Sequence, residues 1–69
     1  MKISARNTLT GKVKSLVHGP VSTEVIVEIA SGIEIVSVIT SHSAQDLGLK
    51  QGSAVTVIIK ASNVLLAVD

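Results

Sequence analysis

The chain has 69 residues and contains no Cys, Phe, Trp or Tyr. A domain of this size buries only about 60% of the surface of its unfolded chain and needs further support, which disulfides and thiolate zinc sites cannot supply here. The formal net charge of +1 excludes a polybasic surface for nucleic acids or membranes. Because 46% of the residues are hydrophobic and the mean hydropathy is +0.60, we expect a homo-oligomer whose subunits cover each other's aliphatic surface.

Neither end of the chain resembles a targeting or membrane segment. The stretch Met1 to Arg6 lacks the apolar region of a signal peptide. The longest apolar run, Val64 to Val68, is far too short to span a membrane. We therefore expect a soluble, cytoplasmic protein.

The first half of the chain alternates apolar and polar residues with period two, which is typical of strands with one buried face. The first strand is predicted from about Ser4 to Leu16, with Gly11 at a bend or bulge. The second covers Val21 to Ala30, between the turn signals His18-Gly19-Pro20 and Ser31-Gly32.

The second half adds three strands that are apolar on both faces, over Ile33–Thr40, Ala54–Lys60 and Val64–Val68. In so short a chain, a neighbouring subunit is expected to cover the second face. One helical turn is predicted from Ser43, as N-cap, to Leu47, with Gly48 as the residue that ends it. This order predicts an all-β fold in one domain over residues 1–69. The expected architecture is a five-stranded barrel of the oligonucleotide/oligosaccharide-binding (OB) type with a short helical turn between strands three and four, and a sandwich of the same order remains open.

Polar clusters interrupt the aliphatic pattern at Ser4-Ala5-Arg6-Asn7, at Lys60-Ala61-Ser62-Asn63 and at Thr40-Ser41-His42-Ser43. A tetrahedral dianion accepts hydrogen bonds only, so its site needs hydroxyls, backbone N–H groups and one or two cations, and no carboxylate. The first two clusters offer this set without Asp or Glu. The same residue types also form ordinary solvated turns, so composition leaves both interpretations open.

The motifs of these clusters resemble the molbindins, the small molybdate-binding (Mop) domains. The resemblance starts with Met1 to Asn7, Leu9 and Gly11-Lys12-Val13, and continues through Gly19, Val21, Glu24 and Val25, Ser43 to Lys50, and Ile59 to Val64. It covers essentially the whole chain and one copy of the domain. The pairing of Ser-Ala-Arg-Asn with Lys-Ala-Ser at this separation is the more specific part.

The resemblance implies an OB-like barrel that assembles as a homohexamer, a trimer of dimers with a strand exchanged between subunits. It also implies binding of molybdate or tungstate between subunits, in intracellular molybdenum homeostasis. The main site would take Ser4, Ala5, Arg6 and Asn7 from one subunit and Lys60, Ala61 and Ser62 from another, with Thr40 nearby. Molybdate or tungstate is the ligand, and no cofactor is expected.

The family also has a second kind of anion site, at the turn after the first strand. Here that turn is His18-Gly19-Pro20-Val21-Ser22. Pro20 has no N–H to donate, so a family donor at this position would be missing.

Other functions find less support in the sequence. His18 and His42 lack the spacing of metal ligands, and Glu24, Glu28 and Glu34 are interpreted as solvated strand residues rather than catalytic carboxylates. No hydroxyl has a His-plus-acid partner, so we predict a binding protein and not an enzyme. A nucleic-acid-binding barrel would need aromatic residues and a basic groove, which are absent. A structural or docking module without a ligand remains the alternative.

Overall fold

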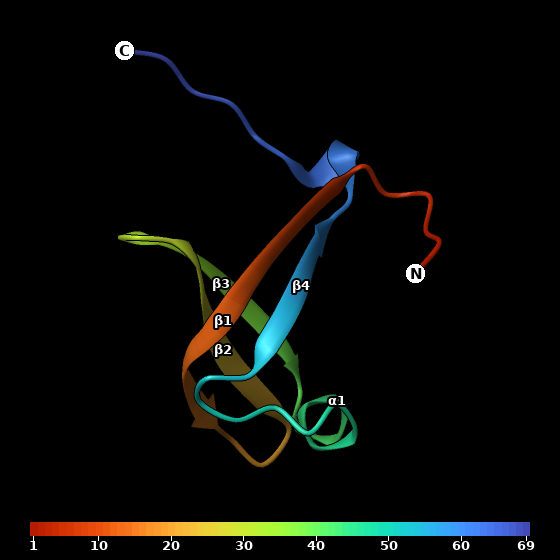
Figure 1. Ribbon diagram of the computed structural model, residues 1–69, viewed down its shortest axis with the longest axis vertical. Helices are drawn as coiled ribbons and strands as arrows, with labels where there is room; N and C mark the ends of the chain where they lie inside the picture. Colours follow the sequence, from red (N-terminus) through yellow and green to blue (C-terminus); the bar gives the residue numbers. More distant parts are fainter.

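The alternating segments form four antiparallel strands in the computed structural model, which describes residues 1–69. The elements in chain order are β1 (Asn7–His18), β2 (Ser22–Ala30), β3 (Ile33–Thr40), α1 (Ser41–Asp46), β4 (Ala54–Ile59) and the 3₁₀ turn η1 (Ala61–Asn63). The strand order is β3-β2-β1-β4, and the sheet is strongly curled (Figure 1). The fold is therefore mostly β, a half-barrel with one short helix.

The long strand β1 connects the two halves of the sheet. Its first half, from Asn7 to Lys12, pairs with β4, and its second half, from Lys12 to His18, pairs with β2. A Cβ on Gly11 would lie only 2.6 Å from the carbonyl oxygen of Glu28 on β2, so glycine permits the close approach. The bulge expected at Gly11 lies farther along, between Val13 and Ser15.

A small aliphatic core fills the concave side of the sheet. Val13, Val25 and Val27 are buried, whereas Glu24 and Glu28 on the opposite parity of β2 are exposed, as the alternation predicts. The partly buried residues packed against this core are Leu16, Ile29, Ile39, Leu49, Val55 and Val57. Only 5 of 69 residues are buried, so one chain encloses little of its aliphatic content.

Several element boundaries differ from the sequence predictions by a few residues. β1 begins at Asn7 rather than Ser4, and β4 ends at Ile59, one residue before Lys60. The helix begins at Ser41 with Thr40 as N-cap, so the predicted N-cap Ser43 was wrong; the Thr40 hydroxyl accepts a hydrogen bond from the Ser43 backbone N–H at 3.0 Å. Gly48, with φ of +62°, follows the end of the helix as predicted.

The fifth strand expected over Val64–Val68 is not formed in the single chain. This segment is the C-terminal tail (residues 64–69), which leaves the sheet beyond η1 and runs away from it (Figure 1). Leu65 and Leu66 are 91% and 93% exposed. A strand needs a neighbouring backbone edge to pair with, and the tail has none beside it.

The edge strands β3 and β4 face each other across an apolar groove. Residues from both strands line it, together with β2 and the segment after α1: Val25, Val27, Ser37, Ile39, Leu47, Leu49, Ala54, Val55, Thr56, Val57 and Ile58. Its volume is about 380 Å³. In a closed five-stranded barrel, one more strand would lie here, between β3 and β4.

None of the helices combines the length and apolar character needed to cross a lipid bilayer.

Candidate oxyanion site

Two polar clusters that are distant in the sequence meet at one end of the sheet. Because β1 and β4 are antiparallel and Asn7 pairs with Ile59, the residues before β1 lie beside those after β4. Together they form an open hollow, the oxyanion hollow, lined by Ile3, Ser4, Ala5, Arg6, Ile58, Lys60, Ala61 and Ser62. The resemblance to molbindins implies that the two clusters come from different subunits, whereas in the single chain they already lie together.

The turn η1 fixes the second cluster. The backbone N–H of Asn63 donates to the carbonyl oxygen of Lys60 at 2.9 Å, and that of Val64 donates to Ala61 at 3.2 Å. These bonds fold residues 60–64 into one compact turn directly after β4. Small side chains at Ala61 and Ser62 leave room for a ligand to approach the backbone of this turn.

The hollow is electropositive and contains no carboxylate. Arg6 and Lys60 both line it, and neither forms a salt bridge, since the two ion pairs of the chain join Lys14 to Glu34 and His42 to Asp46. The hydroxyls of Ser4 and Ser62 likewise make no side-chain hydrogen bond within the chain. Two unpaired cations and two free hydroxyls can together surround an acceptor-only dianion.

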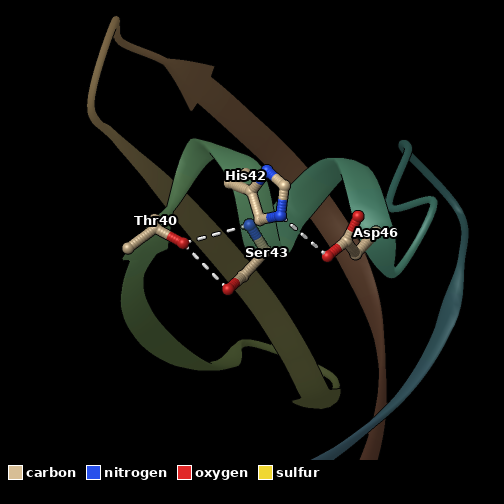
Figure 2. A network of polar contacts seen from close by, with 4 residues as sticks. All are labelled: Thr40, His42, Ser43 and Asp46. Atoms are coloured by element: carbon tan, nitrogen blue, oxygen red, sulfur yellow. Dashed lines mark hydrogen bonds and ion pairs between the residues drawn. The ribbon is translucent and has the colours of Figure 1, made fainter.

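Two residues assigned to this site lie outside the hollow. Asn7 is the first residue of β1 and is exposed beside the hollow without lining it. Thr40 lies at the opposite end of the sheet, where its hydroxyl donates to Ser43 Oγ at 2.8 Å (Figure 2). In the single chain, the Thr40 hydroxyl therefore caps the helix and does not reach the hollow.

The turn expected to form a second anion site uses several of its polar groups internally. The Gly19 N–H donates to the Ser22 carbonyl oxygen at 2.9 Å, and the Gly19 carbonyl oxygen accepts from Ser41 Oγ at 2.7 Å. The buried Thr23 hydroxyl lies 2.8 Å from Ser41 Oγ, which connects the turn to α1. With Pro20 lacking an N–H, fewer donors remain for an anion here.

Sequence reasoning missed Ile3 and Ile58, two apolar residues of the hollow. Ile58 was interpreted only as part of a two-sided apolar strand. The alternation along β4 could have predicted Ile58. The half-buried residues of this strand are Val55, Val57 and Ile59. Ile58 therefore lies on the opposite face, which it shares with Lys60. No three residues among His, Cys, Asp and Glu lie close enough together to hold a metal ion.

Several known proteins are similar to this chain over nearly its whole length. The TOBE domain family model matches residues 3–66. The molybdenum-pterin-binding protein 1 of Clostridium pasteurianum is 46% identical over 66 residues, which cover 96% of this chain and 97% of that protein.

Two solved structures superpose closely on this fold. MopII from Clostridium pasteurianum has a TM-score of 0.91 at 43% identity and covers 97% of this chain and 100% of its own. The cytoplasmic molybdate-binding protein ModG, with molybdate bound, has a TM-score of 0.95 at 45% identity and covers 100% of this chain and 49% of its own. The chain therefore belongs to the TOBE-domain family and, within it, to the small molybdenum-pterin-binding (Mop) proteins, the molbindins.

Proposed function

We propose that this protein binds molybdate or tungstate in the oxyanion hollow and stores the ion in the cytoplasm, as a binding protein without catalytic activity. The observation that carries the proposal is the pair of unpartnered cations, Arg6 and Lys60, beside the free hydroxyls of Ser4 and Ser62. Relatives named for binding molybdenum compounds support the choice of ion.

The chemistry of the hollow favours molybdate over other common oxyanions. At neutral pH, molybdate carries two negative charges and no proton, so donors alone satisfy it. Hydrogen phosphate carries an O–H group that requires an acceptor, and no carboxylate lines the hollow. Sulfate has the same charge as molybdate but is smaller, so the discrimination against it rests on cavity size.

The active form is proposed to be a homo-oligomer. The chain exposes 5520 Å², whereas size scaling gives about 4,100 Å² for a folded monomer of 7.1 kDa. The excess includes the apolar tail and the apolar groove between β3 and β4. Docking the tail of one copy in the groove of another would complete a five-stranded OB-like barrel and bury Leu and Val side chains, each contributing about 1.5–3 kcal/mol before association costs.

Assembly would also bring Thr40 to the site, whereas Asn7 already lies beside the hollow in its own chain. Thr40 lies at the far end of its own sheet, so its hydroxyl can approach the ligand only from a neighbouring copy. Such a contribution would make the site inter-subunit even though Arg6 and Lys60 lie together in one chain. The resemblance to molbindins favours a hexamer, a trimer of dimers, of this single domain (residues 1–69). A second site at residues 18–22 would use the donors that remain around Pro20.

The test is calorimetric titration of the purified protein with molybdate, tungstate, sulfate and phosphate, with light scattering for the mass of the assembly. We expect tight binding of molybdate and tungstate, weaker binding of sulfate and none of phosphate. Equal affinity for sulfate would refute the size argument. If none of the four ions binds, the chain is a structural or docking module and the proposed function is wrong.

A further inference from the structure

The oxyanion hollow and the apolar groove share one wall. Ile58 on β4 lines both, and its side chain is 39% exposed. Any segment that fills the groove therefore contacts the residue that forms the apolar side of the hollow. Packing against a neighbour restricts the rotamers of such a side chain.

The hollow is also continuous in sequence with the tail that we expect to fill the groove. Only Asn63 separates Ser62 from Val64, and the two hydrogen bonds of η1 join residues 60–64. Beyond Val64 the tail is almost fully exposed in the single chain, with Val68 at 97%. A tail that is not docked leaves the turn with Lys60 anchored on its β4 side only.

We propose, on the basis of the function proposed above, that docking of the tail in a second copy raises the affinity of the hollow for its oxyanion. Each docked tail restricts the motion of residues in two hollows. In the copy that receives the tail it restricts Ile58, and in the copy that donates the tail it restricts Lys60 to Ser62. A site whose walls are already ordered loses less conformational freedom when the ion binds. The linkage is reciprocal, so each bound oxyanion strengthens the association of the subunits by the same factor.

A second copy, rather than the same chain, is the occupant of the groove. The tail starts at the η1 end of the sheet and extends away from the sheet of its own chain (Figure 1). Its five apolar residues, Val64 to Val68, would span about 17 Å as a strand, close to the length of the six-residue strand β4 beside the groove. If the tail instead folded back into its own groove, affinity would not depend on protein concentration.

The first experiment measures molybdate affinity at protein concentrations above and below the dissociation of the assembly. We expect the assembled protein to bind about 5- to 150-fold more tightly, the usual range of coupling between sites. We also expect saturating molybdate to strengthen subunit association by the same factor for each ion bound, which analytical ultracentrifugation measures. Molybdate binding of equal strength at every concentration refutes the coupling while leaving the proposed function intact, whereas absence of binding refutes both.

The second experiment changes the tail and leaves every residue of the hollow in place. The Leu66→Asp variant puts a charge on a side chain that is 93% exposed in the single chain, so the chain itself should fold, as circular dichroism would verify. We expect weaker association and weaker molybdate binding. The matched control Ser31→Asp adds the same charge in the exposed turn between β2 and β3 and should change neither.

A third variant separates the shared wall from the tail. Ile58→Ala shortens the side chain that contacts both spaces. We expect its assembled and dissociated forms to differ less in molybdate affinity than those of the unmodified protein. An unchanged ratio of the two affinities would mean that Ile58 does not transmit the effect.

Discussion

The two ends of the sheet carry similar polar residues but use them in opposite ways. At the α1 end, Thr23, Ser41 and the Gly19 carbonyl form a chain of hydrogen bonds, and His42 pairs with Asp46 at 3.2 Å (Figure 2). At the η1 end, the cations and hydroxyls of the oxyanion hollow have no side-chain partner in the chain. Polar groups that are satisfied internally stabilise a fold, whereas convergent groups without partners are available to a ligand.

The largest expected effect comes from removing a cation at the η1 end. Replacing Lys60 by Ala should weaken molybdate binding by about 2–5 kcal/mol, because a desolvated dianion would lose one of its two countercharges. Calorimetry measures the affinity, and light scattering should show that the assembly persists.

The matched control is Lys50→Ala, which removes an exposed lysine in the turn before β4, away from the lining of the hollow. This variant should bind molybdate like the unmodified protein. If Lys60→Ala also binds unchanged, the assignment of the ligand to this hollow is wrong.

The sequence alone predicts most of the strands and most of the polar residues of the hollow. Period-two alternation locates β2 almost to the residue, because burying one face of a strand constrains every second side chain. The bounds of β3 were predicted from a segment that is apolar on both faces. Ser4, Arg6, Lys60 and Ser62 were identified by residue type and resemblance, and the antiparallel pairing of β1 with β4 brings them together.

Two features escaped sequence reasoning, one for a local reason and one for a tertiary reason. The helix starts at Ser41 and not Ser43, since the Thr40 hydroxyl accepts the hydrogen bond at its N-terminus, and several neighbouring residues could have served as the cap. The segment Val64–Val68 has the composition of a strand, but composition does not specify whether a partner edge exists in the same chain. The tail therefore has no strand geometry in the single chain.

A smaller effect, on the stability of the fold and not on ligand affinity, is expected at the α1 end. Replacing Ser41 by Ala removes the acceptor at 2.8 Å from the Thr23 hydroxyl, a side chain that is 0% exposed. Leaving this buried hydroxyl with only the 3.5 Å contact to His18 Nδ1 should lower the free energy of unfolding by about 1–3 kcal/mol. Urea denaturation measures the loss.

Molybdate affinity should be retained in Ser41→Ala once the protein is folded, since the hollow is at the other end of the sheet. Ser31→Ala is the control, because the exposed Ser31 hydroxyl makes no side-chain hydrogen bond and lies outside both proposed anion sites. A Ser41→Ala protein of unchanged stability but reduced molybdate affinity would reverse our assignment of roles to the two ends.

The smallest expected effect concerns a cation that, unlike Arg6 and Lys60, has a carboxylate partner. The hydrogen bond that Lys14 Nζ donates to the Glu34 carboxylate, together with the charge of that carboxylate, raises the pKa of the exposed Lys14 above its ordinary value of 10.5. Because the folded-state pKa lies above that of the unfolded chain, the stabilisation is fully present below pH 10.5 and is lost as the pH rises through the folded-state pKa. Solvent screening keeps the contribution small. In Glu34→Gln, a nuclear magnetic resonance titration should find the pKa of Lys14 closer to its ordinary value, with molybdate binding unchanged; an unaltered pKa would mean that Glu34 is not its partner in solution.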